Sequence, residues 1–331
     1  MTAETPTPVP TLKVEDLAVS YDVARGGFLR GSHVMKAVEG VSFAIGRGET
    51  LGLVGESGSG KSTIGRAILR RVPLAAGRVL LEGKDISRAH GKALQRLRAR
   101  MQLVLQDPYA SLNPRMSVLD IVAEPLVVHG RVASRAEARE KVIALLDLVG
   151  LPEDAYERHP HAFSGGQRQR IGIAWALALE PPLIVADEPV SALDVSVRAQ
   201  VINLMQDLQE RLGLSYLFIA HDLAIVRHIS HRIAILYAGR LVELAGREAI
   251  YTTPRHPYTE ALLAAVPVTD PKVQRGRRHQ SIKGEVPDLT RPPPGCMYAP
   301  RCPLATDLCR ERAPLLEAKS PGHYVACWHR N

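Results

Sequence analysis

The sequence predicts an α/β fold in which buried parallel strands carry phosphate-binding and acidic residues to one edge of a sheet. Three observations support this prediction. A glycine-rich loop stands between an expected strand and an expected helix, an apolar run ends in two carboxylates, and a serine followed by two glycines opens another helix.

The glycine-rich loop is the segment from Gly55 to Ser62, with the pattern Gly-x-x-x-x-Gly-Lys-Ser. Such glycines let backbone N–H groups curve around an anion, the lysine reaches the β- and γ-phosphates, and the serine hydroxyl binds Mg²⁺. We expect a buried strand at 50–54 and a helix at 62–71 whose N-terminus faces the phosphates. The strand–loop–helix setting disfavours a glycine-rich turn that binds nothing. The candidate ligands are Gly55, Gly58, Ser59, Gly60, Lys61, Ser62 and Thr63.

The apolar run from Pro182 to Asp187 is followed directly by Glu188. It is typical of a buried parallel strand that brings acids to a site at its C-terminal end. Asp187 is placed to hold Mg²⁺, and Glu188 to orient and deprotonate the water that attacks the γ-phosphate. An acidic pair that merely stabilises a helix N-terminus is the alternative. The apolar strand and Pro189 argue against it.

A second candidate phosphate site begins at Ser164. The serine can cap a helix, and Gly165 and Gly166 let backbone approach an anion. One nucleotide cannot easily use both phosphate sites of one chain. The second site therefore indicates a nucleotide held mainly by another subunit.

These motifs, in this order, resemble the ATP-binding subunits of ABC transporters. The signature motif of that family matches Ser164 to Gln167, and Gln106, Asp194 and His221 match its Q-loop, D-loop and switch histidine. The resemblance implies that Glu188, Gln106 and His221 are catalytic, and that Ser62, Gln106 and Asp187 hold Mg²⁺. It implies nucleotide contacts from Tyr21, Ser164, Gly165, Gly166, Gln167 and Asp194.

Some positions match this family less closely. Tyr21 resembles the aromatic residue that stacks on adenine, but a tyrosine that packs on a sheet edge is an alternative. Phe163 stands where the family pattern has leucine, and we expect it still to pack in the interior. Trp175 stands where an arginine is common in the family. This difference puts in doubt one local surface or interface contact, but it does not affect the catalytic acids.

The resemblance implies a P-loop NTPase ABC cassette, with a RecA-like core, an antiparallel β subdomain and a helical subdomain, followed by a C-terminal oligopeptide-transporter extension. We expect a disordered arm at 1–10, the cassette at 11–250 with its helical subdomain at about 111–180, and the extension at 251–331. Further strands are expected at 12–21, 41–45, 77–81, 101–106 and 215–220, and helices at 118–128, 135–149, after Ser164 and at 198–212.

Three segments resemble the oligopeptide/dipeptide importer branch: 106–114, His256 to Thr259, and the insertion at 25–33, which resembles the second (F-type) ATPase of these importers. The resemblance implies ATP hydrolysis that powers peptide import, together with a second, related ATPase subunit, two transmembrane permease subunits and an extracytoplasmic substrate-binding protein. An ATPase of a nickel or other non-peptide importer shares these motifs and remains an alternative. A soluble ABC protein of translation or DNA repair is less favoured, because a second cassette and a long coiled coil are both absent from the sequence.

Length and composition agree with one cassette plus an appendage. The chain has 331 residues, of which 46% are hydrophobic. The sequence contains no apolar run as long as the roughly 18 residues of a transmembrane helix. Residues 1–10 lack the apolar core of a signal peptide. We therefore expect a peripheral protein on the cytoplasmic face of the membrane. The excess of 42 Lys and Arg over 34 Asp and Glu suits anionic ligands but gives no reason to expect nucleic-acid binding.

The cysteines Cys296, Cys302, Cys309 and Cys327 all follow the last catalytic motif. A reducing cytosol disfavours disulfides, so clustered thiols suggest a soft-metal site. The tight Cys pairs of zinc sites are absent, and four thiolates suit a [4Fe–4S] cluster, which some importer ATPases of this family carry in this region. Zinc, with His323 or His329 as mixed ligands, and unligated thiols remain open. The prolines at 292–294, 300, 303 and 314 predict a tail with little regular structure.

Overall fold

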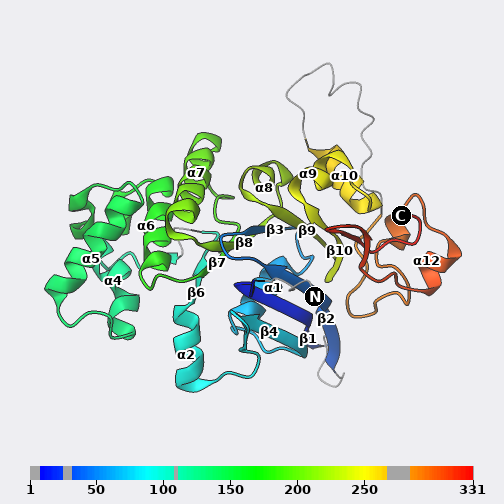
Figure 1. Ribbon diagram of the computed structural model, residues 1–331, viewed down its shortest axis with the longest axis horizontal. Coiled ribbons are helices and arrows are strands. Elements are labelled where there is room, and N and C mark those ends of the chain that lie inside the picture. The colour runs from blue at the N-terminus through cyan, green and yellow to red at the C-terminus, as the bar shows by residue number, and fades with distance from the viewer. Residues whose placement is uncertain (1–7, 25–31, 108–110, 267–283, 331) are drawn as a thin grey trace, which may run out of the picture. The chain divides into compact units, whose positions relative to one another are not determined.

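The computed structural model describes residues 8–24, 32–107, 111–266 and 284–330 (Figure 1). They form two compact units, each assembled from separate stretches of chain. The first unit comprises residues up to 13, 44–49 and 80–219, and the second comprises 14–43, 50–79 and the residues from 220 on. Most of the expected disordered arm and of the insertion at 25–33, and part of the segment 106–114, lie outside the described residues.

The first unit contains a parallel sheet in the strand order β8–β7–β6. Met101 of β6 lies opposite Leu183 of β7, and Val185 of β7 lies opposite Leu217 of β8. The apolar residues of β7 are buried, which confirms the expected buried strand. The strands of this unit are β5 (Lys84–Asp85), β6 (Met101–Val104), β7 (Leu183–Asp187) and β8 (Ser215–Ala220), whose last residue belongs to the second unit.

The helices α4, α5 and α6 of the first unit pack on one another (Figure 1). Each begins at a serine whose hydroxyl accepts a hydrogen bond from the backbone N–H three residues later: Ser117, Ser134 and Ser164. The expected helix at 118–128 is confirmed, and the one at 135–149 ends one residue earlier. The helical segments are α2 (Gly91–Ala99), α4 (Val118–Val128), α5 (Arg135–Leu148), η1 (Glu153–Glu157), η2 (Pro160–Ala162), α6 (Gly165–Leu177) and α7 (Val195–Leu212).

The second unit is built around the strands β3, β9 and β10. The strand β3 pairs in parallel with β9, with Leu51 opposite Arg232, and β9 pairs in antiparallel fashion with β10. In a separate sheet, β2, β1 and β4 are neighbours in that order. The strands are β1 (Leu12–Ala24), β2 (Ser32–Ile45), β3 (Thr50–Val54), β4 (Ala76–Leu81), β9 (Arg232–Tyr237), β10 (Arg240–Gly246), β11 (Glu317–Ser320) and β12 (His323–Val325). Residues 12–13 of β1, 44–45 of β2 and 80–81 of β4 belong to the first unit. The helical segments are α1 (Lys61–Ile68), α8 (Leu223–Ile229), α9 (Arg247–Thr252), α10 (Pro257–Ala265), η3 (Ala299–Arg301) and α12 (Asp307–Glu311).

The helix after the glycine-rich loop is shorter than expected. It ends at Ile68, whereas the sequence suggested a helix as far as residue 71. Arg70 has a φ of 55°, a left-handed conformation that a right-handed helix cannot continue. The last expected turn is therefore absent. None of the helices in the described ranges combines the length and apolar character needed to cross a bilayer.

The C-terminal tail is more regular than its prolines suggested. The strands β11 and β12 form an antiparallel pair, and β12 also pairs with β10, with Glu243 opposite Val325. His323 and Val325 alternate with the exposed Tyr324, so one face of β12 is buried. The prolines at 292–294, 300, 303 and 314 lie outside the two strands, and Pro321 lies in the turn between them, so none interrupts the pairing.

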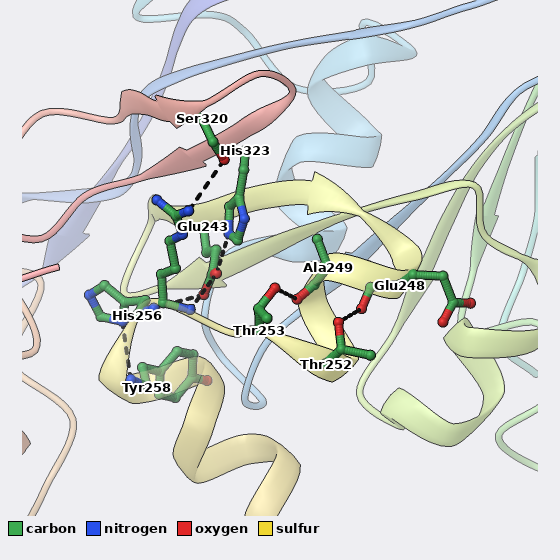
Figure 2. Close-up of polar contacts among 10 residues, drawn as sticks. Glu243, Glu248, Ala249, Thr252, Thr253, His256, Tyr258, Ser320 and His323 are labelled. Atoms are coloured by element: carbon green, nitrogen blue, oxygen red, sulfur yellow. Dashed lines mark hydrogen bonds and ion pairs between the residues drawn. The ribbon is translucent and has the colours of Figure 1, made fainter. Parts of the chain in front are cut away.

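A buried carboxylate joins the hairpin to the chain that follows β10 (Figure 2). Glu243 has no exposed surface, and its Oε2 accepts a hydrogen bond of 2.9 Å from the His256 N–H. Its Oε1 accepts one of 2.8 Å from the Arg255 N–H and lies 2.7 Å from Nε2 of His323. A buried carboxylate needs such partners to offset its lost hydration. One side chain therefore links β10, the start of α10 and β12.

We expect Glu243→Gln to lower the free energy of unfolding by about 1–3 kcal/mol, because an amide cannot accept hydrogen bonds at its nitrogen end and leaves a buried donor unsatisfied. Urea unfolding of the full chain would measure the change. Glu248→Gln is the matched control, because Glu248 points away from this cluster in Figure 2 and its side chain is 65% exposed. Equal losses of unfolding free energy in both variants would show that the hydrogen bonds of Glu243 add nothing to stability.

Candidate active site

The phosphate loop of the second unit adopts a backbone that only glycine tolerates well at two positions. Gly58 and Gly60 have φ values of 77° and 104°, in the left-handed region. A Cβ on Gly60 would lie 2.6 Å from the carbonyl oxygen of Ala37, whereas a Cβ on Gly58 would meet nothing within 4 Å. Gly58 is therefore required by backbone angle, and Gly60 by both angle and space.

Neighbouring backbone holds the loop from its inner side. A Cβ on Gly55 would lie 2.2 Å from the carbonyl oxygen of Leu236 in β9, so the two backbones touch. The Gly239 N–H donates to the Ser59 carbonyl at 2.9 Å, and the Ser59 N–H donates to the Glu56 carbonyl at 3.1 Å. The loop is thus fixed against the end of β9 and the turn that connects β9 to β10.

The candidate phosphate-binding lysine is buried inside the loop. Lys61 is 5% exposed, and its Nζ donates to the carbonyl oxygens of Gly55 and Glu56, each at 2.8 Å. It opens α1, which has no acidic residue in its first turn. Ser62 and Thr63 follow on that turn and are half-buried. A helix N-terminus with a lysine and hydroxyls, and without carboxylates, suits a phosphate group.

Glu56 in this loop contacts the C-terminal region. No sequence motif indicated this contact. Its N–H donates to the Tyr258 hydroxyl at 3.0 Å. Its carboxylate accepts two hydrogen bonds from the Arg301 guanidinium, at 2.8 and 3.2 Å. Burial raises the pKa of Tyr258, which keeps this hydroxyl neutral. Tyr258 belongs to a segment that resembled the importer branch, but that resemblance gave it no role.

The acidic strand end lies in the first unit. Asp187 is the last residue of β7, and Glu188 has a φ of 49°, an unfavourable angle for a residue with a side chain. The Glu188 N–H donates to the Ile219 carbonyl at 2.9 Å, and its carbonyl accepts from the N–H and the hydroxyl of Ser191 at 3.2 and 3.1 Å. Neighbouring backbone therefore holds Glu188 in a strained conformation of the kind found at functional sites.

Gln106 contacts Glu188 directly. The Gln106 Nε2 donates to the Glu188 Oε2 at 3.1 Å, across 82 residues of sequence. The structure thus brings together two of the three residues expected to be catalytic. It places the third, His221, at an exposed position after β8.

The second glycine pair opens α6 as expected. Ser164 and Gln167 form a reciprocal capping box: the Ser164 hydroxyl accepts from the Gln167 N–H at 3.4 Å, and the Ser164 N–H donates to the Gln167 Oε1 at 3.0 Å. A Cβ on Gly166 would lie 2.3 Å from a methyl group of Val197, so this glycine lets α6 approach α7. Gly165 is half-buried and Ser164 is exposed. The capping role and an exposed anion site are compatible.

Three further positions complete the predicted residues. Asp194 is exposed at the N-terminus of α7, and Val195 beside it is 79% exposed. Tyr21 is a half-buried residue of β1. Phe163 is 5% exposed, which confirms that it packs in the interior.

The cysteines gather in one part of the second unit without forming a disulfide. The Cys296 N–H donates to the Cys309 carbonyl at 2.7 Å, and the Cys309 Sγ lies 3.3 Å from Nε2 of His329. Burial raises the pKa of the Cys302 thiol to about 11, and the charges of the other three thiolates act in the same direction. Among the described residues, however, no three His, Cys, Asp or Glu side chains converge closely enough to hold a metal ion. His323 is paired with Glu243.

Comparison with protein families agrees with this geometry. Residues 38–191 match the family model described as ABC transporter, and residues 242–309 match that described as oligopeptide/dipeptide transporter, C-terminal region. A dimeric ATP-binding cassette, MJ0796, solved in a post-hydrolysis state with ADP and Pi, superposes with a TM-score of 0.62 at 29% identity. The match covers 71% of this chain and 98% of that one.

Two curated relatives match almost throughout. The oligopeptide transport ATP-binding protein AppF of Bacillus subtilis is 50% identical, over 96% of this chain and 96% of the relative. The oligopeptide transport ATP-binding protein OppF of Salmonella typhimurium is 48% identical, over 96% of this chain and 95% of the relative. The chain therefore belongs to the ATP-binding subunits of ABC transporters, in the branch that carries the oligopeptide/dipeptide transporter C-terminal region.

Proposed function

We propose that this subunit hydrolyses ATP to power the import of dipeptides or oligopeptides by a membrane ABC transporter. The proposal rests on two parts that occur in one chain. The first is the cassette with its phosphate loop, and the second is residues 242–309, which match the C-terminal region of oligopeptide/dipeptide transporters. The relatives AppF and OppF, named for oligopeptide transport, support the same substrate class.

In this proposal the phosphate loop binds the triphosphate. Lys61 and the backbone N–H groups from Gly58 to Thr63 contact the β- and γ-phosphates. Tyr21 stacks on the adenine. Support comes from the left-handed backbone of Gly58 and Gly60 and from the buried Lys61, whose Nζ donates to two carbonyl oxygens of the loop.

Mg²⁺ would be held by Ser62, Gln106 and Asp187. A hydroxyl, an amide and a carboxylate supply the oxygen ligands that this ion prefers, so the donor set fits it. Bound Mg²⁺ neutralises charge on the phosphates. Glu188 orients and deprotonates the attacking water, and Gln106 and His221 sense the γ-phosphate. The hydrogen bond between Gln106 and Glu188 supports a shared role.

The second phosphate site serves a nucleotide bound mainly by another, related ATPase subunit. Ser164, Gly165, Gly166 and Gln167, with Asp194, would face that partner. Their support is the exposure of Ser164, Asp194 and Val195, and the dimeric state of the similar solved cassette MJ0796. No arginine finger is evident in the sequence, so the partner's signature loop would stabilise the transition-state charge.

The whole chain would have one cassette at 11–250, with its helical subdomain at about 111–180, a disordered arm at 1–10 and an extension at 251–331. It would sit at the cytoplasmic face of the membrane with two permease subunits and an extracytoplasmic binding protein. The segment at 106–114 would move a docking surface for the permease when nucleotide binds.

The four cysteines would bind a [4Fe–4S] cluster that folds the tail and takes no part in hydrolysis, with zinc as the alternative. The described side chains do not form a site for a single ion. A cluster of four irons holds its thiolates further apart than one ion does. Besides burial, the charges of the other three thiols raise the Cys302 pKa, which supports a common site.

We expect Glu188→Gln to bind Mg-ATP normally and to lose about 10²–10⁴-fold in hydrolysis rate, because an amide cannot accept the proton of the attacking water. The assay uses the assembled complex with the partner's own site disabled. Glu124→Gln, on the exposed surface of α4, is the control. Turnover near that of the unmodified complex would remove Glu188 from the mechanism.

Ser164→Arg should leave nucleotide binding at Lys61 intact but abolish most hydrolysis in the complex, because the bulky cation blocks the second phosphate surface. Ser134→Arg is the matched control, because Ser134 caps α5 as Ser164 caps α6. Loss of either cap costs about 1 kcal/mol of stability. The composite-site proposal fails if both variants hydrolyse ATP alike, or if the isolated chain is as active as the complex.

Protein prepared without oxygen should contain about four irons per chain, as a [4Fe–4S] cluster requires. Cys302→Ser should lower that content and loosen the residues after Gly295, while the cassette still binds ATP. Metal analysis and hydrogen exchange would measure both. Stoichiometric zinc, or no metal in the anaerobic preparation, would exclude the cluster.

A further inference from the structure

Every polar group of Glu56 in the phosphate loop is held by another residue. Its N–H donates to the Tyr258 hydroxyl at 3.0 Å, and its carbonyl accepts from the Lys61 Nζ at 2.8 Å. Its carboxylate receives two hydrogen bonds from Arg301. One loop residue therefore connects the candidate phosphate-binding lysine with two residues of the C-terminal region.

Arg301 is placed to hold this carboxylate strongly. Its side chain is 7% exposed, that of Glu56 is 27% exposed, and the two-pronged geometry gives both strength and direction. The Arg301 Nη1 also donates to the Tyr237 hydroxyl at 3.3 Å, and the guanidinium carbon lies 5.7 Å from the centre of the Tyr237 ring. A partly buried pair of this kind is costly to break from one side, because the remaining charge loses its partner.

Three tyrosine rings form the wall behind the pair. The Tyr237 ring packs edge-on against those of Tyr258 and Tyr298, with centroid distances of 4.7 and 5.1 Å. All three residues are at most 2% exposed. The packing therefore fixes Arg301 and Tyr258 before any ligand binds. Their hydrogen bonds in turn restrict the conformation of Glu56.

This arrangement has two consequences for an anion in the loop. An unpaired carboxylate on a loop residue repels phosphates, and the Arg301 charge offsets that repulsion. A loop already held in shape also loses less conformational freedom when it binds. Both effects favour nucleotide binding, and neither requires Arg301 to touch the nucleotide.

We propose that Arg301, in the C-terminal region, is a positioning residue for ATP binding, acting through Glu56 of the phosphate loop. The proposal rests on the proposed nucleotide-binding function of that loop. It makes the C-terminal region a structural part of the phosphate site. Its distinctive consequence is that the effect of Arg301 depends on the Glu56 carboxylate.

The test is a cycle of full-length variants that compares Arg301→Met with and without Glu56→Gln. Equilibrium binding of a fluorescent N-methylanthraniloyl-ATP is measured for each. We expect Arg301→Met alone to raise the Kd about tenfold, since it leaves an unpaired carboxylate beside the phosphates. In the Glu56→Gln background the same substitution should change the Kd less than about twofold, because the interaction is already lost.

Arg330→Met is the matched control. Arg330 also lies in the tail and pairs with a glutamate: its Nη2 donates to both carboxylate oxygens of Glu260 in α10, at 2.8 and 3.1 Å, and not to the loop. It should leave the Kd unchanged. The proposal is overturned if Arg301→Met leaves the Kd unchanged, or if it raises the Kd equally in both backgrounds, as general loosening of the tail would. Failure of the unmodified chain to bind the nucleotide would instead contradict the proposed function.

Discussion

The structure of the second unit depends on one constraint: a phosphate loop must present backbone N–H groups along a fixed curve. Gly58 and Gly60 reach the required left-handed angles, and the space beside Gly60 is too small for a side chain. Gly55 touches the backbone of β9, and Gly239 bonds to the loop itself. Surrounding backbone and side chains therefore fix the shape of the loop.

Buried and partly buried charges attach the C-terminal region to this framework. Glu243 binds the chain after β10 and the hairpin strand β12, while Arg301 binds Glu56 in the loop. Each carboxylate has at least two donors, so neither is buried uncompensated. Such polar contacts demand one geometry, whereas apolar packing alone tolerates several. The tail therefore meets the loop in a defined way even though its regular structure is short.

Local sequence signals predicted much of the fold. The strands β3 and β7 followed from apolar runs of suitable length, α4 and α5 from helical periodicity, and α6 from the serine and two glycines that open it. The phosphate loop and the acidic strand end were visible because their chemistry needs particular residues at fixed spacing. The end of α1 was missed because Arg70 takes a left-handed angle that arginine rarely adopts, and the hairpin of β11 and β12 because its pairing partner, β10, lies far away in sequence. The contact between Glu56 and Arg301 spans 245 residues and has no local signature at either end.

If the C-terminal region and the phosphate loop form one energetic unit, as we propose, the coupling between them must be reciprocal. The most direct test is amide hydrogen exchange of the full chain with and without saturating Mg-ATP. We expect nucleotide to slow exchange in the loop from Gly55 to Ser62 and also in the tail segment from Tyr298 to Cys302. Slower exchange in the loop, with no change in that tail segment, would contradict it.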